Sequence, residues 1–155
     1  MKTENFINID LILLADDDAD DCMLFKSALD EFCISIKLVS VHDGEAAMKW
    51  LNTNEQLPNI IFLDMNMPCK NGAECLAEIK EIERLKNIPV VIISTSLDEH
   101  MIKSLYENGA TWYIKKPHLF SHLKSLVAQV INLVKKGNSP LSTLDKFVLT
   151  AENKK

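Results

Sequence analysis

The chain has 155 residues and a formal net charge of −5, with 47% hydrophobic and 25% charged residues, close to the average of globular domains. This length suits one domain with one core and, together with the composition, excludes a disordered chain and a fibrous repeat. The acidic balance and the lack of a long basic stripe argue against nucleic acid as a partner, and no apolar run approaches the roughly 20 residues that a membrane span needs.

Five short apolar runs recur along the chain. They cover residues 11–15, 34–41, 60–63, 90–93 and 111–114. The first, third and fourth runs are apolar at almost every position, as buried parallel strands are. The run 34–41 alternates between apolar and polar residues, which suits a strand at the edge of a sheet.

Segments with helical period separate these runs, and several have clear start or stop signals. Asp43 is expected to cap the second helix and Asn71 the third. The sequence SLDE at 96–99 has the pattern of a capping box that opens the fourth helix, and the NG at 108–109 is a suitable end for it. An apolar stripe over 119–134 predicts the last helix.

Five alternations of strand and helix predict a doubly wound α/β sheet with right-handed crossovers. The residues after 136 fall outside this pattern. Their apolar patch, residues 147–149, could dock on the domain or on another subunit, and the tail could also be solvated and mobile.

Doubly wound sheets bind ligands at the carboxyl ends of their strands. The first run ends in Asp16-Asp17, the third in Asp64, the fourth in Ser94 and the fifth in Lys116. Several carboxylates at one point need a hard cation, and oxygen ligands with room for water favour Mg²⁺. An aspartate beside such a metal can accept a phosphoryl group, whose charge the metal, an ammonium and a hydroxyl would stabilise.

These residues, in this order, resemble the receiver domain of response regulators, the family of the chemotaxis response regulator. The resemblance covers about residues 9–134. It implies a flavodoxin-like (βα)5 three-layer sandwich with a five-stranded parallel sheet in the order 2-1-3-4-5. We expect a receiver domain over residues 1–136 and a tail over 137–155, without a separate output domain.

The resemblance also implies the roles of the acidic residues. Asp64, in the sequence FLDMNMPCKNG, matches the phosphoacceptor. Asp17 matches the direct Mg²⁺ ligand and Asp16 the acid that more often holds the metal through water. Asp64 and the backbone carbonyl of Asn66 would complete the metal site.

Three further positions match the family on the fourth and fifth strands. Ser94 corresponds to the switch hydroxyl and Tyr113 to the switch aromatic residue, while Lys116 resembles the lysine that contacts the phosphoryl group. In the family the lysine–proline bond is usually cis, so we expect a cis peptide between Lys116 and Pro117.

The expected function is that of a single-domain response regulator, a signalling switch rather than an enzyme. A sensor histidine kinase or a histidine phosphotransfer protein would phosphorylate it in the cytoplasm. A downstream protein would bind the face formed by the fourth helix, the fifth strand and the fifth helix. The length resembles that of small stand-alone regulators, including those that partner phytochrome-like kinases, and we expect a monomer or a weak homodimer.

Two other functions fit the sequence less well. A phosphohydrolase of the haloacid dehalogenase kind also forms an aspartyl phosphate, but it requires an acid two residues after the nucleophile, where this chain has Asn66. A degenerate receiver that only mediates interactions is disfavoured because the site residues are intact.

The acids of the stretch ADDDADD separate into two groups. Asp16 and Asp17 are expected to bind metal, whereas Asp18, Asp20 and Asp21 would start a helix and face water, where the helix dipole favours acids. A calcium loop is excluded because its required glycine and final glutamate are missing. A charge change at Asp21 is therefore expected to have little effect.

The four cysteines contain no C-x-x-C pair, so they indicate neither a zinc site nor a redox motif. They are Cys22, Cys33, Cys69 and Cys75. The chain shows no signal peptide ahead of them, and free thiols in a reducing cytoplasm are expected.

Overall fold

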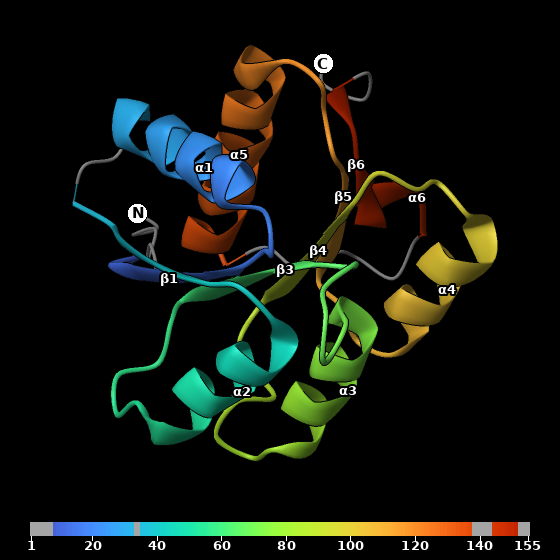
Figure 1. The fold of residues 1–155 in the computed structure, drawn as a ribbon. Coiled ribbons are helices and arrows are strands. Elements are labelled where there is room, and N and C mark those ends of the chain that lie inside the picture. Colours follow the sequence, from blue (N-terminus) through green and yellow to red (C-terminus); the bar gives the residue numbers. More distant parts are fainter. Residues whose placement is uncertain (1–7, 33–34, 138–143, 152–155) are drawn as a thin grey trace, which may run out of the picture.

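In the part of the chain that the structure describes, a parallel sheet of six strands forms the centre of the fold (Figure 1). The computed structural model describes residues 8–32, 35–137 and 144–151. The strands are β1 (Leu11–Ala15), β2 (Lys37–Val41), β3 (Ile60–Asp64), β4 (Val90–Ser94), β5 (Trp112–Lys115) and β6 (Val148–Leu149). Their order in the sheet is β2-β1-β3-β4-β5-β6, and every neighbouring pair is parallel.

Helices cover both faces of the sheet, which makes three layers. They are α1 (Ala19–Phe32), α2 (Gly44–Thr53), α3 (Gly72–Glu81), α4 (Glu99–Glu107), α5 (Phe120–Lys135) and α6 (Leu144–Phe147). The helices α1 and α5 lie together on one face, and α2, α3 and α4 lie on the other (Figure 1). Two apolar clusters fill the spaces between the layers, one on each side of the sheet.

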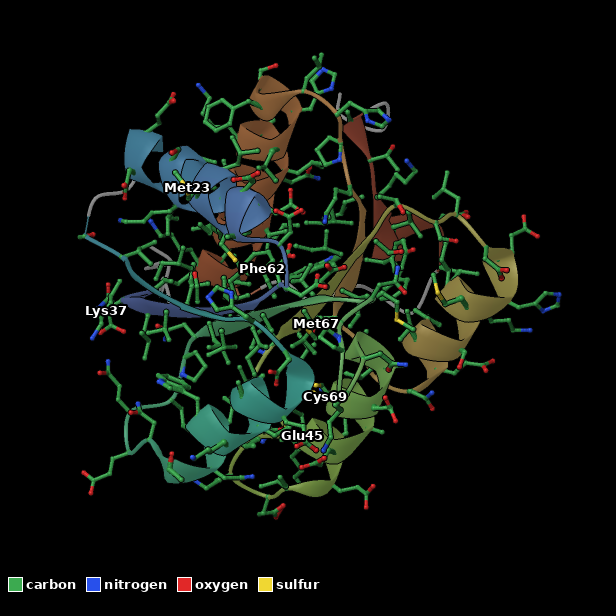
Figure 2. All side chains as sticks on the ribbon, in the orientation of Figure 1. Met23, Lys37, Glu45, Phe62, Met67 and Cys69 are labelled. Atoms are coloured by element: carbon green, nitrogen blue, oxygen red, sulfur yellow. The ribbon has the colours of Figure 1, made fainter. Side chains whose placement is uncertain are left out.

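Full burial on both faces explains why the central strands are apolar throughout. All five residues of β1, β3 and β4 are buried, as expected for a sheet covered on both sides. Figure 2 shows Phe62 of β3 in the interior, where its ring meets that of Phe25 from α1 at a centroid distance of 4.8 Å. Met23, labelled in the same view, lies on the outer surface of α1.

The predicted α/β sandwich and the order of the first five strands are confirmed. The second strand begins at Lys37 rather than at residue 34, which lies outside the described residues. Ile36 is buried in a bend just before that strand, so its apolar character reflects packing rather than strand pairing. Strand β2 is at the edge, as expected, and is only partly buried.

The expected count of five strands is wrong, because part of the tail forms a sixth. Strand β6 pairs in parallel with β5, with Val148 opposite Tyr113 and Leu149 opposite Ile114. Phe147 precedes it and is completely buried. Of the possibilities open for residues 147–149, docking on the chain's own domain is the one realised, and residues 138–143 and 152–155 lie outside the described part.

Most of the predicted helix ends are confirmed, with one correction. The carboxylate of Asp43 accepts from the amide of Ala46, and Asn71 forms a capping box with Glu74. The N-cap of α4 is Asp98 rather than Ser96, because Asp98 accepts from the amide of Met101. Ser96 instead accepts from the amide of Asp98, so it shapes the turn that precedes the helix.

The expected cis peptide at Pro117 is absent. No cis peptide bond occurs within 8–32, 35–137 or 144–151, so the bond between Lys116 and Pro117 is trans. This is the lower-energy form, which most X–Pro bonds adopt.

The thiols that the structure describes are free: Cys22 and Cys75 are buried and Cys69 is exposed. Cys33 lies outside the described residues. None of the helices in the described part of the chain has the length and apolar character that a bilayer span requires.

Candidate functional site

Polar side chains converge where four neighbouring strands end. Asp16 follows β1, Asp64 and Ser94 are the last residues of β3 and β4, and Lys116 follows β5. Backbone hydrogen bonds continue past the strand ends, since the Lys116 amide donates to the Ser94 carbonyl at 2.7 Å and the Asp16 amide to the Val41 carbonyl at 3.0 Å. The carboxyl edge of the sheet therefore holds these residues on rigid backbone, where such folds bind ligands.

Three carboxylates form the centre of the site. One oxygen each from Asp16, Asp17 and Asp64 lies within 4.8 Å of the others. Asp16 and Asp64 are buried, and Asp17 is exposed. Backbone amides orient two of them: the Asp18 amide donates to Asp16 at 2.9 Å and the Asn66 amide donates to Asp64 at 3.3 Å.

Burial disfavours the ionised form of two of these carboxylates and so raises their pKa. Burial and the neighbouring Asp16 raise the pKa of Asp64 to about 6, although Lys116 and the Asn66 amide oppose the shift. Burial also raises the pKa of Asp16, against the lowering effects of the Asp18 amide and Lys116. Carboxylates crowded in this way favour a bound cation, and three carboxylate oxygens are a donor set that fits a hard divalent ion such as Mg²⁺.

Lys116 lies among these acids, and its closest partner was not expected. Its Nζ is 2.7 Å from Asp21 Oδ2, 3.7 Å from Asp16 Oδ2 and 3.9 Å from Asp64 Oδ2. Burial alone would lower the pKa of Lys116, but the hydrogen bond to Asp21 and the charges of Asp16 and Asp64 raise it overall. The lysine is therefore held as a cation within an acidic site.

The expectation that Asp21 only faces water is wrong. It holds for Asp18 and Asp20, since Asp18 caps the first turn by accepting from the Asp20 amide at 2.8 Å and Asp20 is exposed. Helical side chains lean toward the N-terminus of their helix, and α1 begins at the end of β1. The lean of helical side chains is therefore the feature of the sequence that could have placed Asp21 near the site. The sequence contains no sign of its partner, because Lys116 is 95 residues away.

The two predicted switch residues meet at the backbone of Ser96. The hydroxyl of Ser94, which is buried, accepts from the Ser96 amide at 3.1 Å. Tyr113 is also buried, and its hydroxyl donates to the Ser96 carbonyl at 2.6 Å. One peptide segment between β4 and α4 is thus bonded to both side chains.

The loop from β3 to α3 approaches the backbone of Asp64 closely. The Gly72 amide donates to the Met65 carbonyl at 3.0 Å, and a Cβ at Gly72 would lie 2.8 Å from the Asp64 carbonyl oxygen. Met67 and Cys69 lie along this loop (Figure 2). Asn66 lies within it and contacts Asp64 through its amide, and the part of its carbonyl as a metal ligand stays a prediction.

A pocket opens beside Lys116, between α1 and α5. Its lining includes the three site residues Asp16, Asp21 and Lys116, together with Leu24 of α1 and Leu119 at the start of α5. Both leucines are largely exposed. The charged cluster is therefore accessible from an apolar surface.

Comparisons with known proteins point to one family. The chain matches the family described as the response regulator receiver domain over residues 12–128. It is 38% identical over 122 residues to the response regulator Rcp1 of Synechocystis sp. (strain ATCC 27184 / PCC 6803 / Kazusa), a match covering 76% of this chain and 83% of that protein.

Solved structures agree with this family match. The phosphorylated cyanobacterial phytochrome response regulator RcpA superposes with a TM-score of 0.78 at 34% identity, over 86% of this chain and all (100%) of that one. The Mn²⁺-bound form of Rcp1 gives a TM-score of 0.73 at 34% identity, over 81% of this chain and 94% of that one.

Proposed function

Because the chain belongs to the response regulator receiver family of two-component signalling, we propose that it is a single-domain switch that accepts a phosphoryl group on Asp64. The observation that supports Asp64 most directly is its position. It ends a central strand, its carboxylate is buried, and two further acids and Lys116 surround it. A sensor histidine kinase or a histidine phosphotransfer protein is the proposed donor.

In the proposed transfer, a carboxylate oxygen of Asp64 attacks the phosphorus of a phosphohistidine. The bond between phosphorus and the imidazole nitrogen breaks, and an aspartyl phosphate forms on Asp64. With a pKa of about 6, Asp64 is mostly ionised at neutral pH and can act as the nucleophile. The ammonium of Lys116 would then neutralise phosphoryl oxygens, and the Ser94 hydroxyl would donate one hydrogen bond.

Mg²⁺ is the proposed cofactor, held by Asp16, Asp17, Asp64 and the backbone carbonyl of Asn66. The Mn²⁺-bound structure of the relative Rcp1 and the acidic cluster support a divalent ion at this place. When bound, the ion would neutralise charge on the carboxylates and on the incoming phosphoryl group.

We propose that the switch passes through Ser96. If the Ser94 hydroxyl turns toward the phosphoryl group, the Ser96 amide loses its acceptor. The Ser96 backbone is then free to shift, and the hydrogen bond that Tyr113 donates to the Ser96 carbonyl has to lengthen or break. The change would favour a second conformation of the β4–α4 loop. A downstream protein would detect it on the α4–β5–α5 face, where α6 and β6 also lie.

Phosphorylation by a small donor tests the proposal. The protein is incubated with acetyl phosphate and Mg²⁺, and its intact mass is measured. The mass of one phosphoryl group is expected on the native chain and on Asp20→Asn, whose side chain lies outside the cluster, but not on Asp64→Asn. An adduct that survives in Asp64→Asn would refute the assignment.

The same samples distinguish a switch from an enzyme. Steady release of phosphate from small phosphoesters would favour a phosphohydrolase of the haloacid dehalogenase kind instead. We expect no such turnover, because Asn66 cannot replace the acid that those enzymes need two residues after the nucleophile. We also propose that the protein is cytoplasmic and that it is a monomer or a weak homodimer.

A further inference from the structure

Three carboxylates compete for the single ammonium group of Lys116, and Asp21 is the one in direct contact. The distance of 2.7 Å to Asp21 Oδ2 is that of a charge-assisted hydrogen bond. The distances of 3.7 Å to Asp16 and 3.9 Å to Asp64 are too long for hydrogen bonds. In the unphosphorylated chain, Lys116 is therefore bonded to α1 and not to the proposed acceptor.

The position of Asp21 is set by the start of its helix. The Asp21 amide donates to the Asp18 carboxylate at 3.2 Å, and the Cys22 amide donates to the Asp18 carbonyl at 3.1 Å. These bonds order the first turn of α1. Asp21 is thus a fixed anion beside a lysine that follows directly on β5.

We propose that Asp21 is a positioning residue that holds Lys116 away from Asp64 until a phosphoryl group is present. The inference rests on the proposed function, since it concerns the charge that Asp64 gains. An aspartyl phosphate carries more negative charge than a carboxylate and offers three oxygens. Lys116 then exchanges Asp21 for the phosphoryl oxygens, and the energy of its bond to Asp21 is lost in the phosphorylated state.

Asp21 consequently weakens the binding of any phosphoryl-like group at Asp64. Its side chain is 34% exposed and that of Lys116 is 24% exposed, so solvent screens the pair. We expect an effect of about two- to fivefold on affinity, the range typical of a partly exposed ion pair.

Beryllofluoride, which mimics a phosphoryl group on a carboxylate, provides the test. Its affinity is measured by calorimetry at saturating Mg²⁺ for the native chain and three variants. Asp21→Asn is expected to bind about two- to fivefold more tightly than the native chain. Asp21→Glu keeps the ion pair and is expected to restore the native affinity.

Asp20→Asn is the matched control. It removes the same charge from the same turn of α1, but Asp20 is exposed and has no ion pair with Lys116. We expect its affinity to equal that of the native chain. In a Lys116→Gln background there is no ammonium for which Asp21 and the beryllofluoride could compete. Asp21→Asn should therefore have no effect on the affinity for beryllofluoride in that background.

Several outcomes would overturn the inference. Equal gains in Asp21→Asn and Asp20→Asn would show a general charge effect, and weaker binding by Asp21→Asn would show that Asp21 supports the site instead. A gain that persists in the Lys116→Gln background would exclude Lys116 as the mediator. If the native chain does not bind beryllofluoride at all, the proposed function fails as well; if it binds and the variants match it, only this inference fails.

Discussion

Phe147, near the C-terminus, packs its ring against that of Tyr113 in the central sheet, with the centroids 6.3 Å apart. The Phe147 ring also meets Tyr106 of α4 edge-on at 5.2 Å. Tyr113 is the expected switch residue, so the segment after α5 contacts the side chain whose movement the proposed mechanism requires. Residues 144–151 therefore pack against α4 and β5, which belong to the proposed partner-binding face.

Replacing Phe147 by alanine is expected to release this segment. A buried Phe→Ala change in a core costs about 3–5 kcal/mol, but the short segment can detach before the sheet opens, which limits the loss in the free energy of unfolding. We therefore expect faster amide hydrogen exchange in 144–151 and in β5, with a smaller loss of global stability. Exchange followed by mass spectrometry measures both.

Leu144→Ala is a suitable control for that experiment, because Leu144 lies in the same segment and is exposed. It should leave the exchange of β5 unchanged. Unaltered exchange in Phe147→Ala would show that the backbone pairing of β5 with β6 holds the segment without the aromatic contact.

Removal of the Asp17 charge should strongly weaken cation binding. Asp17 supplies one of the three clustered carboxylates and, unlike Asp16 and Asp64, is exposed, so Asp17→Asn should not disturb the core. Because Mg²⁺ prefers charged oxygen ligands, we expect its affinity to fall by about tenfold or more, measured by calorimetry. Asp20→Asn should bind as the native chain does; equal losses in both variants would contradict a specific site.

In the metal-free chain, the contribution of Asp64 to the free energy of unfolding should fall as the pH rises from about 4 to 6. Burial and Asp16 raise the pKa of Asp64 from 3.8 to about 6, so the folded chain binds this proton more tightly than the unfolded chain. The stabilisation is fully present below the unfolded pKa and is lost as the pH rises through the folded one. Asp16, whose pKa is also raised by burial, contributes with the same sign.

Comparison with Asp64→Asn isolates this contribution from the other titrating groups. At pH 7 the variant lacks the buried charge, and it should be more stable than the native chain by on the order of 1–3 kcal/mol. The difference should shrink as the pH falls toward 4, as measured by urea unfolding in the presence of EDTA. A variant that is less stable at pH 7 would contradict the raised pKa.

Gly72→Ala should displace the backbone of Asp64. The new Cβ would lie 2.8 Å from the Asp64 carbonyl oxygen and 3.0 Å from the Met65 Cα, and both are backbone atoms that have little room to move. We expect a loss of about 1–3 kcal/mol in stability, as for other overpacked sites, and slower phosphorylation by acetyl phosphate.

Gly137→Ala separates displacement from backbone strain. Gly137 has φ +74° at the end of α5, and a Cβ there would meet nothing within 4 Å. This variant should lose a little stability through strain but keep the native rate of phosphorylation. If Gly72→Ala is phosphorylated as fast as Gly137→Ala, the close contact does not position Asp64.

The strands and the residues at their ends could be predicted because the position of a strand in the sheet determines which residues it contains. A parallel strand covered on both faces has to be apolar along its whole length, so β1, β3 and β4 stand out in the sequence. Asp64 and Lys116 follow from the same pattern, because parallel strands end at one edge. The start of the fourth helix was predicted wrongly: the SLDE pattern indicated a cap at Ser96, and the path of the backbone makes Asp98 the cap instead.

By itself, the sequence determined the α/β sandwich, since periodicity and strand ends are properties of neighbouring residues. The order of the first five strands and the family followed from the resemblance that the strand-end residues carry. Only the tertiary structure decided that Asp21 belongs to the site and that residues 148–149 form a sixth strand. Both depend on contacts between distant segments, Asp21 with Lys116 and β6 with β5. In the sequence, an acid at a helix start and a short apolar run in a tail are compatible with exposure to solvent and also with a contact elsewhere in the fold. Only the packing of the chain shows which of the two occurs.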